Sequence, residues 1–376
     1  MKVLIAGDFA QHDRLDSLIK DKRFAEIFPD DLCNLVKSAD LSFVNFENPV
    51  AGGHSTPIPK CGPSLRCTPE AIEAVSYVGF TGVTMANNHI MDYGVEGLME
   101  TIKCCRVQGL DIVGVGDSLK DARKVLYLEN KGKTIAIINC CEHEFSIATE
   151  NEAGANPLNP VNQFYAIQEA KNKADYTLVI VHGGHEMFQL PSPRMVETYR
   201  FFIDAGADAV INHHQHCYSG FEFYQGRPIC YGLGNFCFDW DNRHSGIWTE
   251  GYCVVLDLCG NEVTLELHPY IQCTSFPRVH LLNSNVSKDF FLKIDELNSI
   301  IADDKALEDR VYSYYLKGAK YEIGRLEPYS KAWELFLYNR GLLPKYMDKN
   351  KRLSVLGHVM CEAHRDKLIY VLKTTE

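Results

Sequence analysis

The feature that most constrains the fold is an alternation of short apolar runs with stretches of helical character. The runs are rich in valine and isoleucine and have the length of buried strands. Helical segments lie between several of them, such as 68–79, which begins with Thr-Pro and ends with Gly. This alternation predicts an α/β core with helices on both faces of the sheets. The predicted strands are 3–6, 41–46, 82–87, 112–116, 134–140, 176–182, 208–213 and 229–234.

Two polar segments and the C-terminal part of the chain depart from this pattern. Residues 50–64 and 146–162 are rich in Gly, Pro and Asn, so we predict loops that could wall an active site. After about residue 265, apolar residues recur at helical spacing among many charges. We therefore predict a domain over 1–285 and a C-terminal helical extension over 286–376. The extension could cap a pocket or join two chains as a homodimer, and its removal is expected to leave the core and its metal site intact.

The overall charge and the cysteines restrict the partners and the compartment. A net charge of −11 over 376 residues argues against a nucleic-acid-binding protein, which needs a basic face. No run approaches the ~18 apolar residues that a membrane span needs, so none is predicted. The chain starts with a predicted strand instead of a leader peptide, and it contains 14 cysteines. We therefore expect reduced thiols and a cytoplasmic protein.

Unusual polar residues stand where the predicted strands end. In an α/β sheet, ligands bind outside the carboxyl ends of the strands, so these residues converge on one rim. Each has an ordinary explanation alone, such as a helix cap for Asp8 or a turn for 87–89, but all of these coincidences would have to hold together. The residues are Asp8; Asn45 and Glu47; Asn87, Asn88 and His89, with Asp92 nearby; His182, His185 and Glu186; and His213, His214 and His216.

The densest group is VINHHQH, residues 210–216. If the strand continues through it, residues two apart project to the same side, so His214 and His216 face one ion or two neighbouring ions while His213 supports them. Nitrogen and oxygen ligands without sulfur suit Mn, Zn or Fe. Two such ions about 3.5–4 Å apart can activate water and polarise a phosphoryl or acyl group. The sequence therefore predicts a centre for one or two divalent metal ions.

The ordered motifs resemble the CapA family, named after poly-γ-glutamate capsule biosynthesis proteins, and through it the calcineurin-like metallophosphoesterases. The resemblance covers roughly residues 1–260, and it is most specific where ANNHxxDYG and GLGNFxFD occur in this order. It implies a four-layer α/β/β/α sandwich with a metal centre at the carboxyl ends of the strands. The motifs are GD (7–8), N-x-E (45–47), ANNHxxDYG (86–94), H-x-G-x-E (182–186), HHxH (213–216) and GLGNFxFD (232–239).

The resemblance also implies a role for each motif residue. Asp8 and His216 would bind the first metal, and Glu47 would bridge to the second. Asn88, His182 and His214 would complete the second site. His89 would lie over the substrate as a proton donor or electrostatic stabiliser. The residues expected to support them are Asn45, Asp92, Glu186, His213 and Asn235.

Two departures and several functional alternatives accompany this interpretation. Ala10 stands where such phosphoesterases usually have a histidine, so the first metal site has fewer ligands, and Gly183 replaces an aromatic wall residue. The leading hypothesis is a metal-dependent hydrolase that cleaves a phosphoester or amide-type bond in a small-molecule, peptide or polymer substrate. One alternative is a metal-dependent peptide or amino-acid epimerase, in which His89 and His185 shuttle a proton. Others are a non-catalytic, metal-stabilised assembly protein and a fold without metal.

Overall fold

The computed structural model describes residues 1–60, 62–283, 287–329, 331–361, 364–365, 367–369 and 372. The chain divides into two compact units, Met1–Leu307 and Glu308–Glu376. The first unit holds the sheets and every residue of the predicted metal centre, and the second is helical. Among the described residues, no helix is both long and apolar enough to cross a membrane.

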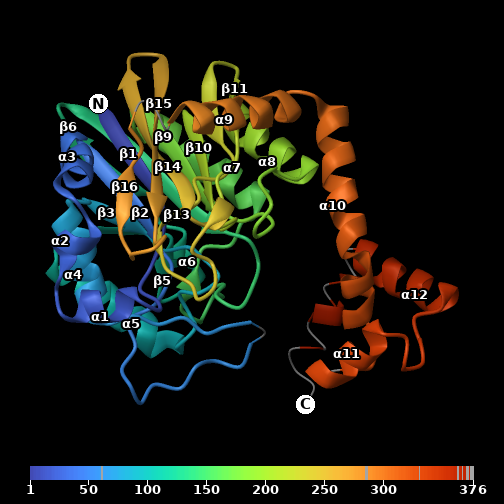
Figure 1. Cartoon of the computed structure of the whole chain (residues 1–376). Coiled ribbons are helices and arrows are strands. Elements are labelled where there is room, and N and C mark those ends of the chain that lie inside the picture. Colours follow the sequence, from blue (N-terminus) through green and yellow to red (C-terminus); the bar gives the residue numbers. More distant parts are fainter. Residues whose placement is uncertain are drawn as a thin grey trace. The chain divides into compact units, whose positions relative to one another are not determined.

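Two β-sheets form the centre of the first unit (Figure 1). The strands are β1 Lys2–Ala10, β2 Leu41–Phe46, β3 Gly82–Thr84, β4 Asp111–Val113, β5 Val115–Gly116, β6 Leu126–Asn130, β7 Lys133–Cys141, β8 Gly154–Ala155, β9 Tyr176–His182, β10 Ala209–His213, β11 Phe221–Tyr224, β12 Arg227–Cys230, β13 Asn235–Phe238, β14 Glu250–Cys259, β15 Glu262–Gln272 and β16 Val279–Leu281. The larger sheet has the order β16-β15-β14-β1-β2-β3-β4, with β13 also paired to β1, and the smaller has the order β11-β12-β10-β9-β7-β6. Strands β5 and β8 form a separate two-stranded sheet. Strands β1 to β4 are parallel, as are β7, β9, β10 and β12, so each set ends at one edge.

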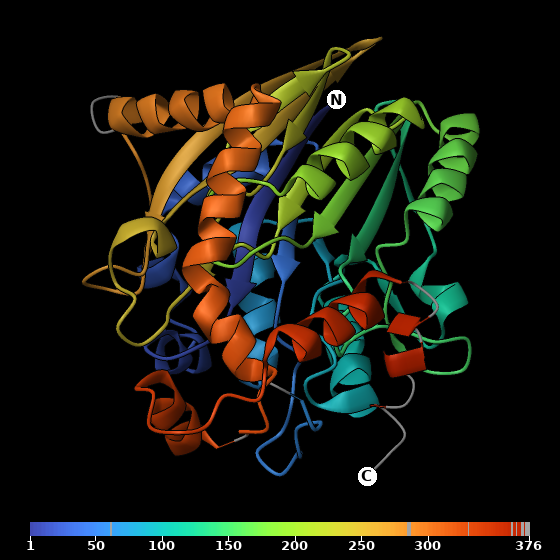
Figure 2. The same ribbon diagram turned by 90° about the vertical axis from the view of Figure 1, so that its right-hand side faces the viewer.

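Helices cover the outer faces of both sheets (Figures 1 and 2). Within the described residues, the helices of the first unit are α1 Leu15–Lys20, α2 Phe24–Ile27, α3 Asp30–Ser38, α4 Pro69–Val78, α5 Gly94–Val107, α6 Leu119–Ala122, α7 Pro160–Lys173, α8 Pro193–Asp204 and α9 Ser287–Ile301. Helix α10 Asp304–Arg325 begins at the end of the first unit, and the second unit also contains α11 Ala332–Asn339 and α12 Lys349–Met360. Helices α1 to α5 share a core with the larger sheet, and α7 and α8 pack on the smaller one. The predicted four-layer α/β/β/α sandwich is confirmed.

Strand β1 shows how the sequence forms these layers. Leu4 and Ala6 belong to the core shared with helices α1 to α5, whereas Val3 and Ile5 belong to the core between the two sheets. Successive side chains of a strand point to opposite faces, so a strand covered on both sides is a continuous apolar run. Each fully buried valine or leucine side chain contributes about 1.5–3 kcal/mol relative to an exposed one.

The structure differs from the predicted elements in several places, of which the following bear on the site and its surroundings. In place of the predicted strand 229–234, the chain forms β12 and then, after a break, β13. The antiparallel β14–β15 pair was not predicted. The predicted loop 146–162 contains β8 and the start of α7. There the Asn159 side chain accepts hydrogen bonds from the amides of Val161 and Asn162, and Pro160 opens the helix. The Asn and Pro taken as loop signals are therefore a helix cap and a first helical residue.

Helix α9 belongs to the first unit, although it follows the predicted boundary at residue 285. Phe290 and Ile294 are buried, and the Phe290 ring lies 4.9 Å from that of Tyr218 and 5.8 Å from that of Tyr252. The Asn298 side chain accepts a hydrogen bond from the Phe221 amide at 2.7 Å. Whether 1–285 and 286–376 are independent domains stays a prediction, but α9 completes the core beside β11.

Candidate metal centre

The predicted ligands meet at the carboxyl edge of the two sheets. In the larger sheet, Asp8 of β1 pairs in register with Asn45 of β2 on one side and Asn235 of β13 on the other. In the smaller sheet, His182 ends β9 and pairs with His213, which ends β10. All five side chains are buried. Parallel pairing therefore joins strand ends that are distant in the sequence.

Gly7 allows β1 to approach β13 closely. A β-carbon at position 7 would lie 1.9 Å from the carbonyl oxygen of Gly234, which is closer than any side chain allows. The next residue, Asp8, donates its backbone amide to the same carbonyl at 3.1 Å. The glycine of the GD motif thus fixes Asp8 beside β13.

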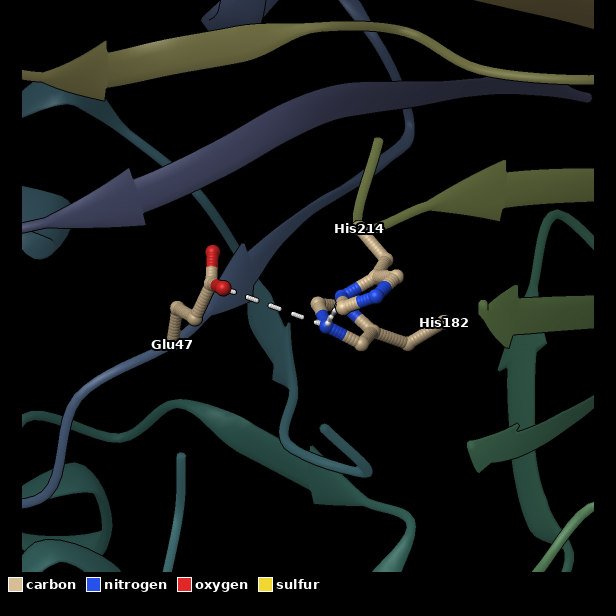
Figure 3. Close-up of side chains that lie close together, drawn as sticks. All are labelled: Glu47, His182 and His214. Atoms are coloured by element: carbon tan, nitrogen blue, oxygen red, sulfur yellow. Dashed lines mark hydrogen bonds and ion pairs between the residues drawn. The ribbon is translucent and has the colours of Figure 1, made fainter. Parts of the chain in front are cut away.

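Glu47, His182 and His214 form one group of converging ligand atoms (Figure 3), which all lie within 4.8 Å of one another. His182 Nε2 lies 3.9 Å from Glu47 Oε1 and 3.0 Å from His214 Nδ1. Asn88 Oδ1 lies 3.0 Å from the same His182 nitrogen. Two imidazoles, a carboxylate and an amide oxygen around one space are a donor set that suits Mn, Zn or Fe.

Asp8, Glu47 and His216 form a second group under the same 4.8 Å limit. His216 Nδ1 lies 3.6 Å from Asp8 Oδ2, and His216 Nε2 lies 3.5 Å from Glu47 Oε1. Glu47 belongs to both groups, so the structure brings all six predicted ligands together with this carboxylate between the two halves. Ala10, two residues after Asp8, packs against Leu65, Phe238 and Trp248 and offers no ligand atom.

The two buried oxygens of Glu47 provide a test of whether a cation fits here. Both are fully buried, and neither has a hydrogen-bond partner in the described part of the chain. An ionised carboxylate without a partner is costly in such a place. Burial, together with the negative charge of Asp8, raises the pKa of Glu47 well above its usual range. Burial also raises the pKa of Asp8 to about 7. A divalent cation would remove this cost, so the residues fit a metal.

The histidines are in the protonation state that metal ligands need. Burial lowers the pKa of His214 to about 4 and that of His216 to about 3. Burial, with the charge of His214 as a smaller cause, lowers the pKa of His182 well below its usual value. All three imidazoles are therefore neutral at pH 7 and can donate a lone pair without first losing a proton.

The backbone after β10 corrects the expectation that 214–216 continues the strand. Strand β10 ends at His213, and His214 and His216 have φ angles of 91° and 52°. Positive φ angles are rare for residues with side chains and cost on the order of 1–3 kcal/mol each. The two rings therefore do not project together from one strand face. They lie 6.1 Å apart, one in each ligand group.

Three of the predicted supporting residues contact the ligands or their strands. Asn45 donates to Asp8 Oδ1 at 2.8 Å. Asn235 Oδ1 lies 2.9 Å from His216 Nδ1. His213 points elsewhere, because its Nε2 lies 2.9 Å from the carbonyl oxygen of Ala6 in the facing sheet. His213 thus ties the two sheets together beneath the ligands.

His89 and Asp92 form a pair next to this centre. His89 Nδ1 lies 2.7 Å from Asp92 Oδ2, which also accepts the Leu65 amide at 2.7 Å. The other carboxylate oxygen of Asp92 pairs with Lys60 Nζ, whose side chain is buried although it comes from the predicted loop 50–64. This nitrogen also lies 3.1 Å from His89 Nδ1. Nδ1 is thus engaged, and Nε2 is the His89 atom left for a substrate.

His185 and Glu186, both predicted to act at the site, belong to neither ligand group. They follow β9 in a turn, where His185 is partly buried and Glu186 is exposed. Burial lowers the pKa of His185, against the opposing charge of Glu142. Their predicted roles, as proton shuttle and as orienting residue, stay predictions.

Glu144 is a residue of the site that the motifs did not indicate. Its Oε1 lies 3.9 Å from His214 Nε2, and its carboxylate accepts a hydrogen bond from the Asn88 side chain. Glu144 follows β7, which is parallel to β9 and ends at the same edge. The rule that located the other ligands, polar residues after a parallel strand, could have located Glu144 too.

A further group of acidic and imidazole side chains lies nearby but is already neutralised. Asp13, Asp239 and His244 bring ligand atoms within 4.8 Å of one another. The Asp239 carboxylate, however, accepts Arg14 Nε at 2.8 Å and Arg14 Nη2 at 2.7 Å. A guanidinium that binds a carboxylate through two parallel hydrogen bonds supplies the charge that a cation would bring.

The family model described as bacterial capsule synthesis protein PGA_cap matches residues 2–240, which include every ligand of the two groups. The chain belongs to this family. The matched region thus covers the first unit up to β13. Helix α9 and the second helical unit lie outside the match.

Curated capsule proteins support this membership. The chain is 34% identical over 212 residues to capsule biosynthesis protein CapA of Bacillus anthracis, an overlap that covers 54% of this chain and 52% of that protein. It is 36% identical over 208 residues to PGA biosynthesis protein CapA of Bacillus subtilis strain 168, covering 54% and 55%. The chain therefore spans about half the length of the curated relatives it matches.

Solved structures similar to this family member are more distant. A novel phosphatase from Mycoplasma pneumoniae matches with a TM-score of 0.45 and 16% identity, over 73% of this chain and 95% of that one. A putative 5'-nucleotidase from Staphylococcus aureus, in complex with alpha-ketoglutarate, matches with a TM-score of 0.43 and 15% identity, over 79% and 58%. Scores this low carry no conclusion about activity.

Proposed function

We propose that the chain is a metal-dependent hydrolase that cleaves a phosphoester or amide-type bond in a substrate of capsule or poly-γ-glutamate-type polymer metabolism. The observation that carries the proposal is Glu47, a fully buried carboxylate shared by two ligand groups that hold three neutral histidines between them. Its two oxygens have no hydrogen-bond partner among the described residues. The membership in the capsule synthesis family supplies the metabolic context.

The ligand set would hold one or two divalent ions, with Mn, Zn and Fe as the candidates. Glu47, Asn88, His182 and His214 would hold one ion, and Asp8, Glu47 and His216 the other. When bound, such ions supply Lewis acidity that polarises a phosphoryl or acyl group and activates water. The chain contributes the fixed positions of these ligands, since Asn45 and Asn235 hold Asp8 and His216 in place.

His89 is the residue that we assign to proton transfer. Its Nδ1 faces Asp92 Oδ2 at 2.7 Å, so Asp92 fixes the ring and leaves Nε2 for the substrate. A proton held at Nε2 can pass to the leaving group or stabilise negative charge that develops there. Lys60 pairs with the other oxygen of Asp92 and keeps the loop 50–64 against His89. These residues would position the reacting bond and exclude water from one side.

The test combines a substrate panel with one charge-neutral variant. Phosphomonoesters, phosphodiesters, γ-glutamyl amides and peptides are assayed with the wild-type chain loaded with Mn²⁺ or Zn²⁺ and with Glu47→Gln. Loss of a group that merely orients a ligand costs about 10–100-fold, so loss of the shared carboxylate should cost more than about 100-fold. Glu129→Gln, which removes an exposed carboxylate of β6, is the matched control and should leave the rate unchanged.

Two results would contradict the proposal. One is a metal-loaded wild-type chain that cleaves no member of the panel. The other is incorporation of solvent deuterium into a peptide or amino-acid substrate without cleavage, which would identify epimerisation instead.

A further inference from the structure

The half of the centre that contains His216 is bordered by aromatic rings. The His216 ring lies 5.3 Å from the Phe238 ring and 5.1 Å from the Trp248 ring, measured between centroids. Trp248 is buried, and its indole nitrogen donates to the Phe238 carbonyl at 3.0 Å. Charges beside such an apolar wall are screened less than charges in water. A charged group here therefore acts strongly on whatever binds next to His216.

Arg243 places a positive charge on this wall. Its guanidinium carbon lies 4.5 Å from the centroid of Trp248 and 5.8 Å from that of Trp240. Stacking on two indoles holds a guanidinium in a defined orientation. The same indole, Trp248, thus contacts both Arg243 and His216. The guanidinium therefore lies on the same aromatic wall as the His216 ring.

Arg243 has no carboxylate partner among the described residues, although it is partly buried. Two aspartates precede Arg243 in this loop. Asp241 is exposed, and Asp239 is buried and bound by Arg14 through two hydrogen bonds. His244 also faces Asp239, at 3.2 Å. The buried negative charge of this loop, on Asp239, is therefore committed to Arg14, and the donors of Arg243 remain available.

We propose that Arg243 binds an oxyanion group of the substrate, a carboxylate or a phosphoryl group, beside His216. A guanidinium offers parallel N–H donors in the planar geometry that both groups accept. This inference rests on the proposed function, because it places that substrate group next to the metal ligands. Arg243 is a binding residue in this account, and it decides which substrates the centre accepts.

The test measures anion binding directly. Inorganic phosphate and glutarate are titrated by calorimetry into the full chain, both loaded with Mn²⁺ and metal-free, for the wild type, Arg243→Gln and Arg243→Lys. A hydrogen-bonded charge of this kind is worth at least about a tenfold change in affinity, so Arg243→Gln should weaken at least one anion by that factor. Arg243→Lys should recover part of the lost affinity, because lysine restores the positive charge but not the parallel N–H donors of the guanidinium. Weakening of phosphate alone indicates a phosphoryl group, and weakening of glutarate alone indicates a carboxylate.

Arg106→Gln is the matched control, because Arg106 is an exposed arginine in the last turn of α5. It removes the same charge and should leave both affinities unchanged. The inference is overturned if the wild type binds neither anion, or if Arg243→Gln binds both as tightly as the wild type. Metal content is measured on the same samples. A wild-type chain without metal would contradict the proposed function, whereas unchanged anion binding by a metal-loaded Arg243→Gln contradicts this inference alone.

Discussion

At the scale of residues, the centre depends on side chains that fix the ligands as much as on the ligands themselves. Asn88 directs its amide oxygen to His182 because its amide nitrogen is held by Glu144. The Glu144 carboxylate also faces His214 Nε2 at 3.9 Å, the nitrogen opposite the one that faces His182. One carboxylate outside the ligand set thus supports two ligands.

Glu144→Gln should therefore weaken metal binding without removing a ligand. The neutral amide can donate as well as accept, so Asn88 loses its fixed orientation and His214 loses a negative neighbour. We expect the Mn²⁺ affinity to fall by about 10–100-fold, measured by titration calorimetry. Glu152→Gln, an exposed glutamate, should have no effect. An unchanged affinity in Glu144→Gln would remove this residue from the site.

The raised pKa of Asp8 predicts how the stability of the metal-free protein depends on pH. Asp8 keeps its proton up to about pH 7 in the folded state, whereas an unfolded aspartate loses it at about pH 3.9. Folding therefore takes up a proton in this window, and stability falls as the pH rises through 7. Glu47 acts with the same sign. The buried histidines have lowered pKa values, so they make the folded state more stable as the pH rises. This gain is complete above about pH 6.5, where the histidines of the unfolded chain are also neutral.

Between about pH 6.5 and 8 the melting temperature of the metal-free chain should therefore fall. Asp8→Asn should show a smaller fall, because the amide does not ionise. The Mn²⁺-loaded chain should show little change, because the cation already favours the ionised carboxylates. Thermal melts at several pH values measure all three. Parallel curves for the wild type and Asp8→Asn would show that Asp8 is not the group responsible.

At the scale of elements, the site residues at or just after the ends of parallel strands were predictable from the sequence, and those on segments away from these ends were not. Asp8, Asn45 and His182 are predictable because parallel strands in register end at one edge. The roles of Lys60 and Arg243 were not predictable, since each stands on an irregular segment whose path is set by contacts with distant residues. The family resemblance did assign His214 and His216 to different ligand groups. The strand pattern missed the turn that separates them, because positive φ angles leave no pattern in the residue types.

The β14–β15 pair and the packing of helix α9 were missed for another reason. Both lie beyond the polar strand ends that organised the prediction, and β14 and α9 each also pack against residues far away in the sequence. Phe290 of α9 is the clearest example, since it is buried against Tyr218 and Tyr252. Whether removal of 286–376 leaves the core intact stays a prediction, and a cut after Leu307 would retain these contacts of α9.

Phe290→Ala tests the contribution of α9. Truncation of a buried phenylalanine costs about 3–5 kcal/mol in the free energy of unfolding, and we expect a loss in this range from chemical denaturation. Leu292→Ala, on an exposed face of the same helix, should change stability by less than about 0.5 kcal/mol. Equal effects of the two variants would mean that α9 does not pack on the first unit.

At the scale of the whole molecule, the family match and the compact units divide the chain differently. The capsule synthesis model ends at residue 240, within the first unit, and the second unit lies outside it. The second unit exposes many large apolar side chains, and large exposed apolar patches mark interaction surfaces. Among them are Leu316, Tyr321, Trp333, Phe336, Leu353 and Met360.

The homodimer expected through the C-terminal helices stays a prediction with a direct test. Light scattering after size exclusion should give the mass of a dimer for the full chain and of a monomer for a chain that ends at Leu307. The apolar side chains of the second unit are the physical reason. A full chain that stays monomeric, or a shortened chain that stays dimeric, would contradict this role of the helices.

The central claim is that Glu47 is shared between two divalent cations. Titration of Mn²⁺ into the metal-free chain tests it most directly, with wild type, His214→Ala, His216→Ala and Glu47→Gln compared by calorimetry. We predict two binding steps in the wild type, the tighter one lost in His214→Ala, the weaker one lost in His216→Ala, and both lost in Glu47→Gln. Unchanged Mn²⁺ binding by a folded Glu47→Gln variant would contradict the claim.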